Sequence, residues 1–455
     1  MKRYYILILI LLSGITHFIY FGYPRNVVFD EVHFGNFASA YTAGNYFFDI
    51  HPPLGKLLIS AAGYIGGYPA ESTNYGQIGN VFGDPRYMWY RILPMLAGFA
   101  LPLVIFFLCL ELGLSPRFSF LAGLLIIFEN SLLVQSRFIL LDSLLLLFGF
   151  SSCLLYAYSL RSTSNRKRLW LILAAALLAT LSYSVKWTGI SFLAVILVVE
   201  LFRVIKAVSW REELRVSLKK AAIFFGVGII IYFLIFAIHF ALLPKSGPGD
   251  AFMSIGFQKT LIGSNYQNSA NAKPLNLVQK FLELNVEMYK ANSTLTATHQ
   301  YGSKWWQWPL MMRPVYYWDN SSLDGGPASA MIYLLGNPFV YWLAFAAVVA
   351  LIIKNFFDRN KKELLMIFAY LLNLLPFIFI SRVAFLYHYE TALVIAIITL
   401  AYLIDHYFKG KTKQITFYSL IVICLAGFLY FSPLTYGFPM NSKALMTRFW
   451  FSSWR

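Results

Sequence analysis

The sequence predicts an all-α polytopic membrane protein, and its composition, its apolar runs and its charge distribution each indicate this class. Of the 455 residues, 59% are hydrophobic and only 13% are charged, whereas about 25% of a soluble domain is charged. A net charge of +17 would suggest a nucleic-acid partner in a soluble protein. Here the basic residues lie mostly in short loops between apolar runs, so we assign them to membrane topology and to anionic lipid headgroups, with no nucleic-acid partner.

Eleven apolar runs are long enough to cross a hydrocarbon core of about 30 Å. The first follows Lys2-Arg3, and because no small-residue cleavage site comes after it, we interpret it as an uncleaved span. We find no internal repeat and expect one transmembrane domain over residues 1–455. The runs lie near residues 4–21, 88–110, 118–133, 138–160, 169–186, 188–203, 219–242, 331–353, 364–381, 385–404 and 415–432.

The charges of the connecting loops predict the orientation. Lys and Arg are concentrated near residues 161–168, 203–220, 354–363 and 409–413, whereas the segment 23–87 carries more acidic than basic residues. Because Lys and Arg accumulate in cytoplasmic loops, the N-terminus is expected inside and the C-terminus outside.

Two predicted outer segments, residues 23–87 and 243–330, are too long to be simple turns, and loops of this length are usually functional or disordered. In the first of them, apolar residues recur at helical spacing over residues 34–43 and 54–64. We expect two short helices there, lying along the membrane surface.

The acidic pair Asp30-Glu31 precedes the first of these helices and is the leading candidate for chemistry. A carboxylate at this place could cap the helix, take the proton of an attacking hydroxyl as a general base, or bind a metal ion with its neighbour. A cap needs only one side chain, and charged groups at a membrane edge are commonly functional. We therefore favour a functional site.

A second polar group, Asp49, His51 and Lys56, follows in the same segment. Pro52 and Pro53 hold the backbone extended before the second short helix, which is a structural role. Lys56 could reach the lipid headgroups or bind an anionic phosphate. We interpret Asp49 and His51 as support for the loop.

Basic side chains stand at the predicted outer ends of several spans. Singly, each is more often an anchor than a ligand, but several cations on one side can share the charge of a lipid phosphate. Asp142 is an alternative, structural partner for Arg137. These basic residues are Arg91, Arg137, Lys186 and Arg382, with His388 close to the last.

The second outer segment is rich in aromatic residues. Tryptophan and tyrosine at this level form an interfacial belt in many membrane proteins, and the same aromatic wall would suit a sugar or a peptide. Its polar and aromatic candidates for substrate binding are His299, Lys304, Trp308 and Arg313.

Several segments together resemble one known family. FDEVHFG, FFDIHPPLGK, QSRFILLDS, VKWTG, SKWWQWPLMMRPVYYW, LGNP and SRVAFLYHY occur in this order between residues 29 and 389, and SPLTYG follows at 432–437. This series resembles the protein O-mannosyltransferases, which use polyprenyl- or dolichyl-phosphate mannose.

The resemblance implies a GT-C-type membrane glycosyltransferase that moves mannose from a lipid phosphate to a Ser or Thr hydroxyl, with inversion. It implies that Asp30 activates the acceptor beside Glu31, and that Arg91, Arg137, Arg382 and His388 hold the donor phosphate. It implies no metal and no cofactor beyond the lipid-linked donor. The partners would be membrane lipid, this donor and acceptor protein segments, with monomer and dimer both open.

Two departures from the family qualify the resemblance. Residues 243–330 cannot hold the β-trefoil module of eukaryotic members, so the chain resembles the compact bacterial form, expected in the cell membrane with its site on the outer face. In a eukaryote the endoplasmic reticulum membrane would take that place. Glu390-Thr391 replaces the Leu-Pro that commonly follows the YHY segment.

Three other functions remain open from the residues alone. A GT-C relative could transfer another lipid-linked sugar or use a lipid or glycan acceptor. A transporter would place charges near the middle of its spans and often show duplicated halves, and this chain shows neither. A scaffold that has lost catalysis would not need these acidic and basic motifs.

Overall fold

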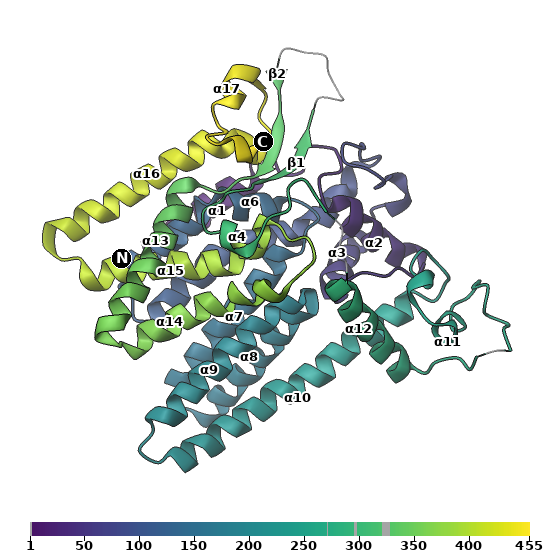
Figure 1. Ribbon diagram of the computed structural model, residues 1–455, viewed down its shortest axis with the longest axis horizontal. Helices are drawn as coiled ribbons and strands as arrows, with labels where there is room; N and C mark the ends of the chain where they lie inside the picture. Colours follow the sequence, from purple (N-terminus) through teal and green to yellow (C-terminus); the bar gives the residue numbers. More distant parts are fainter. Residues whose placement is uncertain (1, 271, 295–297, 321–327) are drawn as a thin grey trace.

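The computed structural model describes residues 2–270, 272–294, 298–320 and 328–455 as a bundle of long apolar helices (Figure 1). Within these residues, nine helices are long and apolar enough to cross a membrane, and one bent pair makes a tenth. Each of the eleven predicted runs contains a helix, and the first contains the 17-residue helix α1 (Lys2–Phe18). The other long elements are α4 (Met88–Glu111), α5 (Pro116–Ile127), α6 (Asn130–Arg137), α7 (Asp142–Arg161), α8 (Asn165–Val185), α9 (Ile190–Lys206), α10 (Trp210–Leu242), α13 (Pro338–Asp358), α14 (Lys361–Leu372), α15 (Glu390–Tyr407) and α16 (Gly410–Tyr436).

Helix α15 forms the centre of the bundle and is buried along nearly its whole length, against α13, α5 and α14. Helix α10, in contrast, exposes a broad apolar surface that includes Ile229, Ile230, Leu234 and Ile238. Apolar side chains on the outside of a helix bundle match a lipid surrounding rather than water. The burial pattern therefore fits the multi-span membrane protein that the composition predicts.

The remaining elements gather at one end of the bundle. In Figure 1, α2 and α3 lie at the end away from the marked N-terminus, and α12 lies beside them. The two helices predicted in the first outer segment are both present. These short elements are α2 (Glu31–Ala43), α3 (Leu54–Ile65), α11 (Ile255–Gln258), α12 (Leu277–Thr294) and α17 (Ser442–Met446).

The all-α prediction missed two small antiparallel sheets. Strand β1 (Val315–Asp319) pairs with β3 (Met331–Leu334), and β2 (Ala328–Ser329) pairs with β4 (Met440–Asn441). The first four residues of the predicted run 331–353 therefore form a strand, and its helix starts only at Pro338. The apolar strand directly precedes the apolar helix, so composition alone could not separate the two.

The third predicted span is broken, because α5 and α6 meet at an angle of 58°. The Glu129 carboxylate accepts the backbone N–H of Ser131 at 2.9 Å and so starts α6 as a new helix. The Asn337 side-chain amide donates to the carbonyls of Phe128 (2.9 Å) and Cys424 (2.7 Å). The bend is thus held by hydrogen bonds of Glu129 and Asn337.

Replacing Asn337 by alanine is expected to destabilise the protein. The substitution leaves two buried carbonyls without their donor, and each such group costs about 1–3 kcal/mol. Thermal unfolding in detergent should show a lower Tm for Asn337→Ala and an unchanged Tm for Asn268→Ala, which alters an exposed loop residue. Equal Tm values for both variants would contradict this account of the bend.

Candidate active site

A tight turn places the two acids of the Asp30-Glu31 pair. Phe29 takes a positive φ of 42°, donates its N–H to the Tyr317 carbonyl at 3.1 Å, and stacks on the Tyr317 ring at 4.4 Å. A non-glycine residue in this conformation is strained and persists only where its surroundings hold it. Strand β1 therefore fixes the turn from which α2 begins.

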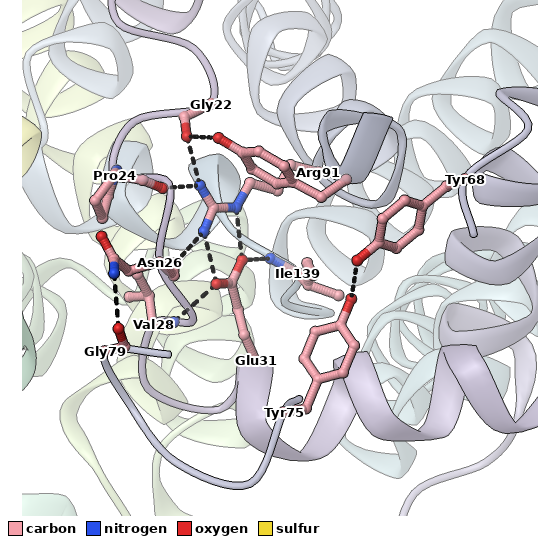
Figure 2. A network of polar contacts seen from close by, with 11 residues as sticks. Gly22, Pro24, Asn26, Val28, Glu31, Tyr68, Tyr75, Gly79, Arg91 and Ile139 are labelled. Carbon is pink, nitrogen blue, oxygen red and sulfur yellow. Dashed lines mark hydrogen bonds and ion pairs between the residues drawn. The ribbon is translucent and has the colours of Figure 1, made fainter. Parts of the chain in front are cut away.

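Glu31 is fully buried and forms a two-pronged ion pair with Arg91 of α4 (Figure 2). The guanidinium donates to both carboxylate oxygens at 2.7 Å. The same oxygens accept the backbone N–H groups of Val28 at 2.8 Å and Ile139 at 2.9 Å. Both oxygens of this carboxylate already accept two hydrogen bonds each, so Glu31 has no free position from which to take a proton from a substrate.

The other N–H groups of Arg91 donate to backbone carbonyls in the segment that follows α1. Figure 2 shows its guanidinium donating to the carbonyls of Gly22 (2.9 Å), Pro24 (2.8 Å) and Asn26 (2.9 Å). All five N–H groups are engaged, and the side chain has no exposed surface. The prediction that Arg91 binds the donor phosphate is therefore wrong, because it has no free donor to offer.

Arg137 has a similar structural role. It is 2% exposed, donates to the carbonyls of Ile19 (2.9 Å) and Tyr20 (2.8 Å), and lies over the Tyr436 ring at 4.6 Å. It closes the C-terminal end of α1, where carbonyls lack helical partners. We therefore withdraw the prediction of Arg137 as a phosphate ligand. Asp142 is not its partner either, because that carboxylate pairs with Lys186.

Asp30 stands at the cap position of α2, but its side chain makes no capping hydrogen bond. Within the described residues its half-buried carboxylate has no hydrogen bond or ion pair. Burial raises the pKa of Asp30 to about 6; the carboxylates of Asp142 and Asp49 add to this rise, and the positive charges of His33 and Lys186 oppose it. A free carboxylate with a pKa near neutrality has the properties of a general base.

Lys186 and Asp142 form the nearest ordered ion pair. The Lys186 ammonium contacts both oxygens of Asp142, at 2.8 and 2.7 Å. The Asp142 carboxylate also accepts from Gln135 at 2.8 Å, and Gln135 in turn accepts the Tyr317 hydroxyl at 2.7 Å. This series of hydrogen bonds joins α6, α7 and β1. It also holds the Lys186 ammonium close enough to Asp30 to act on the pKa of that carboxylate.

Asp49 and Lys56 pair with one another inside the first outer segment. The ammonium of Lys56, which is 1% exposed, contacts the Asp49 carboxylate and the His51 carbonyl, the latter at 2.7 Å. Both side chains therefore hold the loop before α3, as predicted for Asp49. The alternative that Lys56 binds a phosphate does not fit, because its charge is already neutralised and enclosed.

Arg382 brings a positive charge to the two imidazoles His51 and His388. In the part of the chain that the structure describes, the half-buried Arg382 guanidinium has no hydrogen bond or ion pair. Burial, and next the positive charges of Lys186 and Arg382, lower the pKa of His51 well below its usual range. His388 keeps Nδ1 against the Phe385 backbone, within 3.2 Å, and has Nε2 free for a ligand. These groups face each other across the site.

The candidates of the second outer segment lie at different depths. Trp308 is buried, donates to the Ser303 hydroxyl at 3.0 Å, and stacks on His388 at 5.7 Å, so it orients that imidazole. Arg313 donates to the carbonyls of Gln300 and Ser453, which is a structural role. His299 packs its ring on Phe385 at 5.1 Å, and Lys304 is exposed.

The sequence interpretation left out three side chains that line the site, namely Gln135, Tyr317 and Tyr387. Gln135 and Asp142 belong to one motif, seven residues apart, but the bend between α6 and α7 is needed to bring them together. The Lys186 ammonium lies 5.0 Å from the Tyr387 ring. An aromatic-rich motif gave the only signal for the two tyrosines, and it also fits an interfacial belt.

Replacing Arg91 by alanine is expected to unfold the outer end of the bundle rather than to weaken donor binding. Removing one partner of a buried ion pair costs about 3–5 kcal/mol. Arg91→Lys should fail to restore stability, because an ammonium cannot reach five acceptors. The Tm of both variants in detergent tests this; a Tm equal to that of the unaltered protein would contradict the structural role.

Family comparisons match nearly the whole chain. The model described as dolichyl-phosphate-mannose-protein mannosyltransferase matches residues 7–244, and that of the C-terminal four-span region of protein O-mannosyltransferase matches residues 277–454. The chain is 33% identical over 306 residues to dolichyl-phosphate-mannose–protein mannosyltransferase 4 of Candida albicans, covering 64% of this chain and 39% of that protein. It is 35% identical over 280 residues to protein O-mannosyl-transferase 2 of Danio rerio, covering 58% and 36%. The chain thus spans less than half the length of these relatives.

Solved structures share the fold. The S. cerevisiae protein O-mannosyltransferase complex bound to the sugar donor matches with a TM-score of 0.89 at 19% identity, covering 100% of this chain and 92% of that one. ArnT of Cupriavidus metallidurans bound to undecaprenyl phosphate matches with a TM-score of 0.56 at 12% identity, covering 95% and 76%. At these identities the likeness establishes the architecture, that of the GT-C membrane glycosyltransferases.

Proposed function

Because the chain belongs to the dolichyl-phosphate-mannose-protein mannosyltransferase family, we propose that it transfers mannose from a polyprenyl-phosphate carrier to Ser or Thr hydroxyls of proteins. The proposal is carried by Asp30, whose half-buried carboxylate has no hydrogen bond or ion pair among the described residues. The likewise unpaired guanidinium of Arg382 lies close enough to His51 to act on its pKa, as Lys186 does. A transfer from a lipid phosphate to a hydroxyl needs such a base and such a cation.

Asp30 acts on the acceptor. Its carboxylate accepts the proton of the Ser or Thr hydroxyl while that oxygen attacks the anomeric carbon in line, and the bond from this carbon to the phosphate oxygen breaks. One displacement of this kind inverts the anomeric centre. Since the pKa of Asp30 is about 6, the group is ionised at neutral pH yet basic enough to accept the proton as the hydroxyl becomes more acidic.

Arg382 acts on the leaving group. Its guanidinium can bind two oxygens of the departing lipid phosphate and stabilise the charge that develops there. His388 offers Nε2 as a further hydrogen-bonding group, and Trp308 holds that ring in place. Lys186 contributes less net charge, because it already neutralises Asp142.

The remaining partners follow from the same chemistry. The carrier is a membrane lipid, so the site works at a membrane surface, and the distribution of basic loops supports the outer face of a cell or endoplasmic reticulum membrane. Assembly with a second copy or a relative is part of the proposal, since a solved relative is a complex.

Asp30→Asn is expected to abolish mannose transfer and to preserve the fold. Burial disfavours the ionised form of Asp30 in the folded protein. Above about pH 6, where this carboxylate is charged, its charge therefore lowers the free energy of unfolding. Removing it should leave the Tm at pH 7.5 equal or higher. Glu31→Gln, the matched variant next to it, should lower the Tm because it removes a charge from a buried ion pair. Transfer by Asp30→Asn at more than a few per cent of the normal rate would refute its role as base.

The pH profile of transfer should follow the same group. Below pH of about 6 the Asp30 carboxyl is protonated and cannot accept a proton, so kcat/KM should fall about tenfold for each further pH unit. Initial rates between pH 4.5 and 8, with the Tm recorded at each pH, separate this loss from unfolding. A flat profile over this range would exclude Asp30 as the titrating base.

Arg382→Ala is expected to raise the KM for the lipid-phosphate donor by at least about tenfold, the size of one charge-assisted interaction. The Tm should stay unchanged, because the side chain makes no hydrogen bond within the described residues. Lys304→Ala is a matched control, an exposed cation in the second outer segment. For the measurement, each purified variant is incubated with lipid-phosphate mannose or glucose and a Ser/Thr peptide, and the rate of transfer is recorded at several donor concentrations. Product mass identifies the sugar and the acceptor together, and an equal donor KM for both variants would exclude Arg382 as the phosphate ligand.

A further inference from the structure

A groove of about 580 Å³ runs along the exposed side of α2, outside the cationic part of the site. Helix α2 forms its floor with His33, Asn36, Ala40 and Ala43, and Glu71 and Pro248 reach it from the two outer segments. Pockets that enclose a drug-sized ligand have volumes of about 300–1,000 Å³. This groove is therefore large enough for a peptide segment of a few residues.

The groove leads toward Asp30. Residues 30, 33, 37 and 40 are spaced by three or four along α2, so they lie along one side of the helix. His33 and Phe37 both line the groove, and the charge of His33 acts on the Asp30 carboxylate. Glu31 lies about 100° further round the helix, where it meets Arg91. Asp30 thus stands on the side of α2 that lines the groove, one turn before His33, and Glu31 does not.

The lining suits a peptide backbone. Ser39, Ala40 and Ala43 present small side chains, so a second chain can approach the helix closely. The exposed side chains of Asn36 and Asn45 supply both donors and acceptors, the groups that a peptide bond requires. Glu71 is an exposed acid in the lining and gives its end of the groove a negative charge.

We propose that this groove holds the acceptor, an extended peptide segment with its Ser or Thr hydroxyl at Asp30 and small residues against Ala40 and Ala43. A basic residue at the Glu71 end favours binding, and an acidic one weakens it. This assignment rests on the proposed function and deepens it, because it separates an acceptor site along α2 from the donor-binding groups Arg382 and His388.

The first test fills the groove. Ala43→Trp places a large ring over an exposed alanine at the end of α2, and Ala270→Trp makes the same change at an exposed alanine outside the groove. The KM for a ten-residue Ser/Thr peptide should rise at least tenfold in Ala43→Trp and stay unchanged in Ala270→Trp. The affinity for lipid-phosphate mannose, measured without peptide, should match between the two variants. An unchanged peptide KM in Ala43→Trp overturns the proposal.

The second test reverses the charge and does not depend on packing. Two peptides that differ by one Lys or Glu beside the acceptor residue should differ in kcat/KM, with the Lys peptide preferred. Glu71→Lys should lower this preference about two- to fivefold, as for an exposed ion pair, and the effect should shrink at high salt. Glu212→Lys, the same change at an exposed acid on α10, should leave the preference intact.

The outcomes separate the two levels of the proposal. If the unaltered protein transfers mannose only to a glycan or lipid alcohol and to no peptide, both the proposed acceptor class and the occupant of the groove are wrong. If it transfers to peptides, but Ala43→Trp and Glu71→Lys behave as their controls do, the function stands and the groove has no part in acceptor binding.

Discussion

The buried ion pair between Glu31 and Arg91 is the interaction on which the outer end of this protein depends. It joins the chain after α1, the start of α2, the body of α4 and the loop before α7 through one set of hydrogen bonds. Two charges removed from water are expensive unless every lone pair and every N–H is used. Here all of them are used, so the pair specifies one arrangement of four segments.

This arrangement decides what the neighbouring acid can do. Residues 30 and 31 are adjacent in sequence, but the first turn of α2 sends their side chains in directions about 100° apart. Glu31 meets its arginine in the interior, while Asp30 remains half-buried and free, with a pKa of about 6. The ion pair thus holds a reactive carboxylate in place without neutralising it. The strained turn at Phe29, clamped by β1, serves the same purpose.

The rest of the bundle brings separate segments to that carboxylate. The bend between α5 and α6 is held by hydrogen bonds of Glu129 and Asn337. After α6, the backbone N–H of Ile139 donates to Glu31, the neighbour of Asp30. Lys186 arrives from the end of α8, and Arg382 and His388 from the chain before α15. Asp30 and Arg382 thereby lie on different elements, so a substitution of one need not disturb the other.

The sequence by itself determined the fold class, the apolar runs and the two short helices after Asp30, and it singled out Asp30 as a candidate. Hydrophobic periodicity and a charged motif beside an apolar run are local signals. It could not separate Arg91 and Arg137 from Arg382, since all three stand at the end of an apolar run. Their roles depend on which carbonyls and carboxylates fold against them, up to 69 residues away for Arg91. The strand at Met331–Leu334 was hidden for a related reason, as its apolar residues run into a helix. Only the tertiary structure decided which charged side chains are paired within the protein and which stay unpaired, because ion pairs form between residues that are far apart in the sequence.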